Sequence, residues 1–282
     1  MRYLIGGLSV LILLVIVVFS SQPGVHLRYL PNSEAEAEYW YWLNHEVFKV
    51  DPTDCHVLSP LRRSQSQLII RYVRENAGRL FRTEIDTIPL SSETHSLEEM
   101  GKQRFDQWLN DYRMAGVLWR DSSGAIYEQN QYSLPDFVYL RFLQILQPVM
   151  PKSRVHEGDS WSVVYQKHLS GDTLLCESSI YRLHALNEVN GERQAVIHFN
   201  NTWTWQKQQD STWIPIGSDS LRLVQVQIQS DGEATFDCNH GIPMHQTITL
   251  QIRQDYQTGT GNRRVVFSRE KITVEYCATE VG

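Results

Sequence analysis

The most constraining feature of the sequence is the alternation of apolar and polar residues through its second half. Residues 223–230, LVQVQIQS, alternate Val224, Val226 and Ile228 with glutamines, and residues 247–254, TITLQIRQ, repeat the pattern. Because successive side chains of a strand point to opposite faces, this pattern predicts antiparallel strands with one buried and one solvated face. The buried face needs a cover, which a second sheet, helices or a ligand can supply.

Turn-forming residues separate further strand-like segments. Asn190-Gly191 is the preferred dipeptide of a two-residue hairpin turn. Ser230-Asp231-Gly232 and residues 258–262 predict two more turns, because glycine adopts backbone angles that other residues avoid. In the first half, residues 67–88 and 117–129 each alternate around a turn signal, so both predict hairpins.

Two helices are predicted in the first half. Ser96-Leu97-Glu98-Glu99 is a capping box, and apolar residues recur at helical spacing from there to Tyr112. Residues 134–147 follow the cap Ser133 and carry apolar side chains around most of the helix, so this helix is expected to be buried or to close over an apolar groove. Residues 34–50 fit a capped helix as well as an alternating strand, and the sequence leaves them open.

These elements predict an α+β fold. A large antiparallel sheet, half-barrel or sandwich-like, is expected to pack with the two helices. The hydrophobic fraction of 41 % and the charged fraction of 21 % are those of a folded chain rather than a disordered one.

The start of the chain predicts export. Residues 3–19, YLIGGLSVLILLVIVVF, carry no charge. As a helix they would be about 26 Å long, near the lower limit for spanning a bilayer and longer than the core of most signal peptides. We therefore expect residues 1–21 to be a transmembrane anchor or a cleaved signal peptide. Residues 22–34 would form a linker, 35–150 a mixed α/β lobe and 151–282 an antiparallel β lobe in the cell envelope or outside the cell.

Composition and motifs exclude several functions. Lys and Arg number 26 against 32 Asp and Glu, and this net charge of −6 disfavours a nucleic-acid partner. The sequence holds no G-x-S-x-G, H-E-x-x-H or phosphate-binding glycine loop, so it predicts no catalytic residue and no cofactor. Cys238, His240 and His245 lack the paired short spacing of a zinc site, so no metal is expected. Glu157 and Asp159 flank Gly158 and are interpreted as a turn that leads into a strand.

Four cysteines fit an oxidising compartment. Cys55, Cys176, Cys238 and Cys277 are even in number, and none belongs to a C-x-x-C pair. One or two disulfides are one interpretation. Isolated buried thiols, which pack as small apolar side chains, are the other.

Aromatic residues are the remaining candidates for binding. Trp203 and Trp205 alternate and would share a sheet face. With Phe137, Leu140 and Leu143 of the predicted helix 134–147, they are the expected ligand-binding residues. Core packing between sheet and helix is the alternative, because aromatic side chains are common in strands.

One segment resembles a known group of proteins. Pro148 to Lys152, Val155 and the sequence Gly158-Asp159-Ser160-Trp161 resemble a proline-led segment and GDSW strand start found in uncharacterised exported bacterial β-rich proteins. A later order of Gly232, Phe236-Asp237 and Gly241 is also similar, so the resemblance covers residues 145–255. It implies an envelope location and β architecture, and it transfers no site residue because that family has no established activity. The predicted mixture of helices and sheet also resembles the half-barrels of periplasmic lipoprotein carriers.

The sequence therefore predicts an exported, non-catalytic module that binds an apolar ligand, a lipid or an envelope partner. It would contact the membrane through the N-terminal segment. A structural scaffold of the envelope, and a hydrolase whose residues come from distant parts of the chain, are the alternatives.

Overall fold

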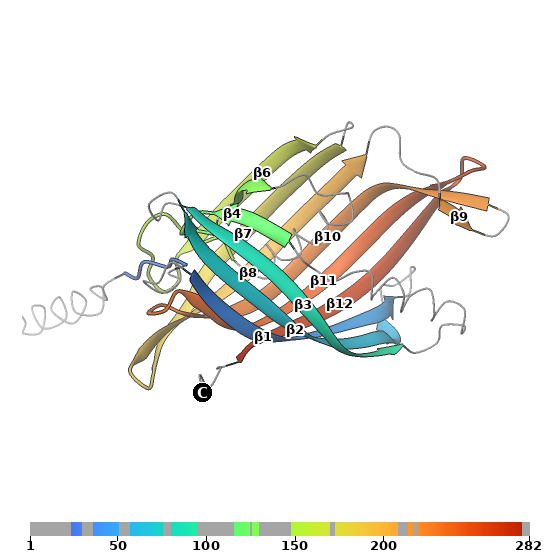
Figure 1. Cartoon of the computed structure of the whole chain (residues 1–282). Coiled ribbons are helices and arrows are strands. Elements are labelled where there is room, and N and C mark those ends of the chain that lie inside the picture. The colour runs from blue at the N-terminus through green and yellow to red at the C-terminus, as the bar shows by residue number, and fades with distance from the viewer. Residues whose placement is uncertain are drawn as a thin grey trace, which may run out of the picture.

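The described part of the chain forms one antiparallel sheet (Figure 1). The computed structural model describes residues 24–29, 36–50, 57–75, 80–94, 116–124, 126–129, 148–169, 173–207, 214–216 and 219–277. Its twelve strands are β1 (Glu36–Val50), β2 (Val57–Glu75), β3 (Leu80–Thr94), β4 (Gly116–Arg120), β5 (Ile126–Gln129), β6 (Ser160–Leu169), β7 (Thr173–Val189), β8 (Glu192–Lys207), β9 (Ile214–Ile216), β10 (Asp219–Asp237), β11 (Ile242–Thr258) and β12 (Arg263–Cys277).

The first and last strands meet in the middle of the sheet. The strand order is β5-β4-β3-β2-β1-β12-β11-β10-β8-β7-β6, and the short β9 pairs with β10. The β1–β12 pairing runs from Trp40 opposite Cys277 to Lys49 opposite Ser268. It joins strands from residues 35–150 to strands from residues 151–282 in one sheet, while the division into two lobes stays a prediction. Among the described strands, β5 and β6 form the two edges, and the sheet between them is strongly curved (Figure 1).

The expected α+β class is wrong for the described residues, which form strands and no helix. The undecided segment 34–50 supplies β1, because pairing with both β2 and β12 satisfies its backbone and buries Tyr39, Tyr41 and Leu43 on one face. The residues predicted as helices, Ser96 to Tyr112 and 134–147, lie outside the described residues, as does the N-terminal segment 1–21. Within the described ranges, no helix has the length and apolar character needed to cross a membrane.

Several predicted hairpins are confirmed. Asn190 and Gly191 both have positive φ, 54° and 82°, and join β7 to β8. Residues 258–262 join β11 to β12, and the hairpins predicted over 67–88 and 117–129 are β2–β3 and β4–β5. These turns are set by the local sequence, which is why alternation and glycine placement predicted them.

The turn predicted at Ser230-Asp231-Gly232 is wrong, because these residues lie within β10. A Cβ atom on Gly232 would lie 2.4 Å from the carbonyl oxygen of Thr247 and 2.7 Å from Cζ of Phe199. Glycine is therefore present here because the neighbouring strand and an aromatic ring approach the backbone closely, which is a known role of glycine within strands.

The sheet buries one face, here called the interior face, and exposes the other, here called the outer face. In β7, Tyr181 and Leu183 are buried, while Ile180 and Arg182, which alternate with them along the strand, are exposed. The described side chains of β1, β2, β8, β10, β11 and β12 alternate in a similar way, and the buried apolar side chains of the sheet form one cluster. Its members from the sheet include Tyr41, Leu68, Ile70, Leu183, Ile197, Phe199, Trp203, Phe236, Ile248, Leu250, Ile272 and Val274.

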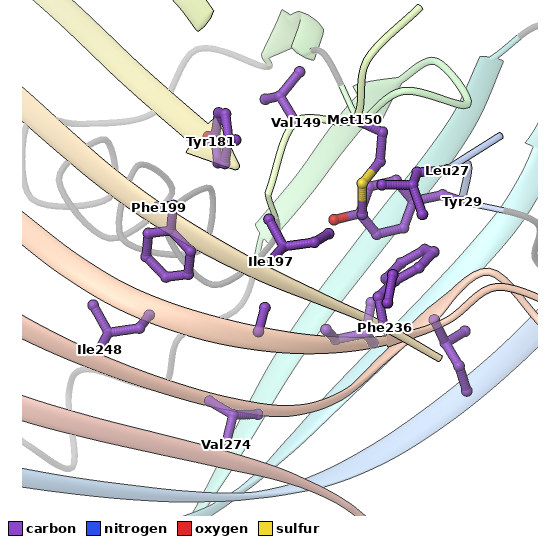
Figure 2. Packing of buried hydrophobic residues seen from close by; sticks show 14 of the residues in the cluster. Leu27, Tyr29, Val149, Met150, Tyr181, Ile197, Phe199, Phe236, Ile248 and Val274 are labelled. Atoms are coloured by element: carbon purple, nitrogen blue, oxygen red, sulfur yellow. The ribbon is translucent and has the colours of Figure 1, made fainter. Parts of the chain in front are cut away.

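Two irregular segments cross one part of the interior face, and we call residues 24–29 and 148–155 the crossing segments. They are joined by reciprocal backbone hydrogen bonds between Val25 and Val155, with N–O distances of 2.8 and 3.0 Å. The Tyr29 hydroxyl donates to the carbonyl oxygen of Pro148 at 2.8 Å, and the Tyr29 ring meets Phe236 edge-on. Figure 2 shows Leu27, Tyr29, Val149 and Met150 beside Phe236 and Ile197 of the sheet. The crossing segments therefore extend the apolar core over the interior face.

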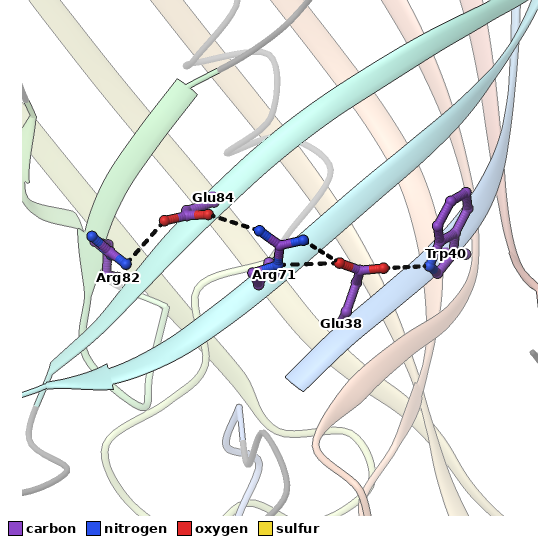
Figure 3. Close-up of polar contacts among 5 residues, drawn as sticks. All are labelled: Glu38, Trp40, Arg71, Arg82 and Glu84. Carbon is purple, nitrogen blue, oxygen red and sulfur yellow. Dashed lines mark hydrogen bonds and ion pairs between the residues drawn. The ribbon is translucent and has the colours of Figure 1, made fainter. Parts of the chain in front are cut away.

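Part of the outer face carries a network of charged side chains. Across β1, β2 and β3, Glu38 accepts hydrogen bonds from Trp40 and Arg71, at 2.8 and 2.6 Å. Arg71 also contacts Glu84 at 3.4 Å, and Glu84 pairs with Arg82 at 3.0 Å (Figure 3). Exposed ion pairs of this kind contribute little stability, typically about 0.2–1 kcal/mol each. Their presence shows that this part of the outer face is built to contact water.

Candidate functional site

A row of polar side chains interrupts the apolar interior face, and we call Ser179, Asn201 and Ser230 the interior polar row. Ser179 lies opposite Asn201 in the β7–β8 pairing, and Asn201 lies opposite Ser230 in the β8–β10 pairing. Residues directly opposite in antiparallel strands share a face, with Cβ atoms about 4.5–5.5 Å apart. All three residues are at most 2 % exposed. Three adjacent strands thus bring three short polar side chains together inside the protein.

Only part of this row is hydrogen-bonded within the protein. The Ser179 hydroxyl donates to Oε1 of the buried Glu177 at 3.0 Å. Among the described side chains, Oδ1 of Asn201 and Oγ of Ser230 are buried with no hydrogen-bond partner. A buried polar atom without a partner typically costs about 1–3 kcal/mol, so native proteins seldom keep one without a reason.

Rows centred on aromatic side chains flank the interior polar row on both sides. On one side Phe199 lies between Tyr181 and Gly232 on the neighbouring strands. On the other side Trp203 lies between Glu177 and Ile228. The polar row is therefore a hydrogen-bonding centre inside an apolar and aromatic surface. This combination is typical of sites for small amphiphilic ligands, where a few polar groups orient a mostly apolar molecule.

Further polar groups lie on the same face of β1 and β12. Nε2 of His45 lies 2.8 Å from Oε2 of Glu270, and both side chains are largely buried. The Tyr41 hydroxyl is buried without a hydrogen-bond partner among the described residues, and burial raises the pKa of Tyr41 well above its ordinary value. Tyr41 also lines a cavity of about 10 Å³ with Leu68 and Val274, which is close to the space of one water molecule.

Of the five binding residues predicted from the sequence, two lie in the described part of the chain. Trp203 is buried on the interior face beside the interior polar row, as a member of the apolar cluster. Trp205 lies two residues further along β8, opposite Leu175, and Phe137, Leu140 and Leu143 lie outside the described residues. A ligand-binding role for these five residues stays a prediction.

Three of the four cysteines lie in the described part of the chain. Cys176, Cys238 and Cys277 are free thiols, so no disulfide joins any two of them, and Cys55 lies outside the described residues. Burial raises the pKa of the Cys238 thiol to about 11, which keeps it protonated and unreactive at neutral pH.

Sequence reasoning missed the interior polar row. Asn201 falls in phase with Phe199 and Trp203, so its side chain points to the apolar face of β8. Ser230 falls in phase with Val226 and Ile228 in the same way. A polar residue at a position where the alternation expects an apolar one was the signal that could have identified the row. It was missed because residues 230–232 were assigned to a turn.

The GDSW segment has a structural role, as its interpretation as a turn predicted. Gly158 has a φ of 89°, and its backbone N–H donates to the carbonyl oxygen of Leu183 at 2.7 Å. The Asp159 carboxylate accepts a hydrogen bond from the backbone N–H of His156 at 2.8 Å, and this bond lowers the pKa of Asp159. Trp161 Nε1 donates to the carbonyl oxygen of Val149 at 2.7 Å. The segment therefore anchors the start of β6 to β7 and to a crossing segment.

One group of described side chains has the composition of a metal site. Ligand atoms of Glu192, Asp237 and His240 lie within 4.8 Å of one another. Both Asp237 oxygens already serve the β10–β11 turn. Oδ1 accepts the backbone N–H groups of Asn239 and His240, and Oδ2 accepts from His240 Nδ1 at 2.7 Å. Turn formation therefore accounts for the placement of Asp237 and His240.

These contacts also set the protonation of the pair. Burial alone would raise the pKa of Asp237, but the hydrogen bonds from the His240 ring and from the two backbone groups outweigh it and lower that pKa. The hydrogen bond to Asp237 raises the pKa of His240.

A second hollow lies near the β11–β12 turn. This groove of about 360 Å³ is lined by Val224, Asp255, Tyr256 and Arg263 among others. Burial alone would raise the pKa of Asp255, but ion pairs with Arg263 and Arg253 lower that pKa. Nε of Arg253 lies 3.0 Å from Oδ1 of Asp255. The buried carboxylate is thus neutralised within the protein and offers no free charge to a ligand.

Comparisons with known proteins give distant similarities only. No family model and no curated protein matches this chain. An outer membrane channel from Pseudomonas putida F1 is 9 % identical with a TM-score of 0.21, covering 88 % of this chain and 98 % of that one. OmpT, an outer membrane protein of Vibrio cholerae in its trimer form, is 10 % identical with a TM-score of 0.23, covering 86 % of this chain and 100 % of that one. TM-scores this low assign neither a fold nor a function to the chain.

Proposed function

We propose that this protein is an exported, non-catalytic envelope protein whose interior sheet face binds an apolar ligand of the lipid class. The observation that carries the proposal is the difference between the two faces of the sheet. The interior face is mostly apolar and aromatic from β2 through β12 to β8. The outer face of β1–β3 instead carries a chain of ion pairs between side chains. A curved sheet with an apolar interior and a solvated exterior is suited to hold an apolar molecule away from water.

The sequence supports the location. The uncharged residues 3–19 favour export, and the GDSW segment resembles exported β-rich proteins. In the envelope, an apolar molecule between two membranes or outside one needs a protein that shields it from water. Among the described strands, β5 and β6 are the edges of the sheet and do not pair with each other.

An envelope scaffold has less support. Val164 and Ile180 are exposed on the outer face near the edge strand β6, by 78 and 57 %. Scattered exposed apolar residues are normal on protein surfaces and do not by themselves indicate a partner.

Quenching of tryptophan fluorescence tests the proposal on the full chain in detergent solution. The probe is methyl 9,10-dibromostearate, whose bromine atoms quench indoles that they approach closely. We expect saturable quenching that is reduced by Trp203→Phe, because Trp203 lies on the interior face. The matched control, Trp42→Phe, removes an indole that is 38 % exposed, and it should leave the saturable component unchanged. Quenching that does not saturate, or that falls equally in both variants, would overturn the proposal.

A further inference from the structure

The interior polar row is the strongest unexplained feature of the described residues. Its unpartnered atoms are Oδ1 of Asn201 and Oγ of Ser230, each in a side chain that is 2 % exposed. They lie on directly opposite residues of β8 and β10, so both are available to one small group. An apolar pair of similar shape would avoid the cost of burying them, so the sequence keeps polar atoms here against packing energetics.

The two unpartnered atoms of the row are oxygens, and one of them is an obligate acceptor. The amide oxygen of Asn201 can only accept hydrogen bonds, and the Glu177 carboxylate beside it already accepts one from Ser179. The Ser230 hydroxyl can accept as well as donate. A ligand group that satisfies Asn201 must therefore carry a hydrogen-bond donor, and a second donor can be accepted by Ser230.

We propose that the interior polar row binds the polar end of an amphiphile that bears at least two hydrogen-bond donors, such as hydroxyl or ammonium groups, while its acyl chain lies on the flanking aromatic rows. This inference rests on the proposed function and names the ligand class within it. The two flanking rows, which contain Phe199 and Trp203, provide the apolar contact on either side of the polar end.

The geometry also explains selectivity. An acyl methyl ester offers only acceptor oxygens, so it can accept a hydrogen bond from the Ser230 hydroxyl but leaves Oδ1 of Asn201 without a partner. A monoacylglycerol offers two hydroxyl donors in place of the methyl group. A partner for the buried Asn201 oxygen, which the ester cannot supply, is worth about 10- to 30-fold in affinity, so the monoacylglycerol is expected to bind more tightly by about that factor.

The experiment compares three dibrominated probes by quenching of the full chain. They are methyl 9,10-dibromostearate, the corresponding 1-monoacylglycerol and the corresponding primary amine. The variant Asn201→Leu/Ser230→Ala removes both unpartnered atoms with little change of shape. The matched control is Asn200→Leu, which alters the neighbouring exposed residue on the outer face of β8.

We expect the double variant to lose the 10- to 30-fold preference for the monoacylglycerol and to bind the methyl ester as well as the unmodified protein does. Asn200→Leu should keep the preference. The amine shows whether ammonium donors serve as well as hydroxyl donors. The double variant is expected to fold, because it replaces unpartnered buried polar atoms with apolar ones.

The outcomes separate the two proposals. Equal affinity of the unmodified protein for the methyl ester and the monoacylglycerol would overturn the assignment of the polar row, while saturable binding of both would leave the apolar ligand site standing. A preference that survives in the double variant would also overturn the assignment. If no probe binds the unmodified protein saturably, the proposed function itself is wrong.

Discussion

Substitution of Gly232 by alanine tests how closely β10, β11 and Phe199 pack. The added Cβ would lie 2.4 Å from the backbone oxygen of Thr247 and 2.7 Å from Cζ of Phe199. Optimal contacts of carbon atoms are about 3.5–4.0 Å, so both distances fall about 1 Å short. The ring can rotate, but the carbonyl belongs to a paired strand and can move only if β10 and β11 separate locally.

The expected cost follows from two opposing effects. Overpacking a well-filled core costs about 1–3 kcal/mol, and a clash with backbone belongs at the upper end of that range. Alanine restricts the unfolded chain and returns about 0.4–1 kcal/mol. We therefore expect Gly232→Ala to lower the free energy of unfolding by about 2 kcal/mol, which corresponds to a fall in Tm of about 4–8 °C.

Urea unfolding followed by circular dichroism measures this change. Gly191→Ala is the control, because nothing lies within 4 Å of its added Cβ and its cost comes only from the positive φ of 82°. Adding Phe199→Leu to Gly232→Ala removes the ring contact, although the contact with Thr247 remains. Gly232 lies in an extended strand, so without a clash alanine would stabilise the protein. A Gly232→Ala protein as stable as the unmodified chain would refute the packing described here.

Four further predictions each concern a single residue. Tyr29→Phe removes the hydrogen bond to the buried Pro148 carbonyl and should lower the free energy of unfolding by about 1–2 kcal/mol in urea; no change would show that the crossing segments contribute little. Because the pKa of Asp237 is lowered, its contribution to stability is complete above the ordinary Asp pKa of about 3.9 and is lost as the pH falls through the folded pKa. Asp237→Asn should therefore flatten the fall of the free energy of unfolding at acid pH. The raised pKa of His240 acts in the opposite direction. Its contribution to stability is complete below about 6.5 and is lost as the pH rises through the folded value, so His240→Gln should remove that decline. Cys238, with a pKa of about 11, should react with iodoacetamide at pH 8 much more slowly in the native protein than after unfolding in urea, and equal rates would contradict its burial.

Most of what the sequence predicted correctly depends on neighbouring residues. Asn190-Gly191 was identified as a hairpin turn because both residues tolerate positive φ, and the structure has both at positive φ. The same reasoning failed at Gly232. There a glycine is required because Phe199 and Thr247 approach its backbone, and these two residues are distant in the sequence and adjacent only in the sheet.

The candidate site shows the same limit. Trp203 was singled out for its aromatic side chain, and it lies beside the interior polar row. Asn201 was not singled out, because the burial of a polar residue depends on which face of the strand points inward and on which residues lie opposite it. Its neighbours Ser179 and Ser230 come from strands that only the sheet brings together.

The sequence by itself determined the strand character of the second half and the positions of its main turns, because periodicity and positive φ are local properties of the chain. Only the tertiary structure decided that residues 36–50 form a strand, since that segment gains its partners from β12 at the other end of the chain. It also decided that three polar side chains meet inside an apolar face, because register between strands is fixed by packing across the whole sheet.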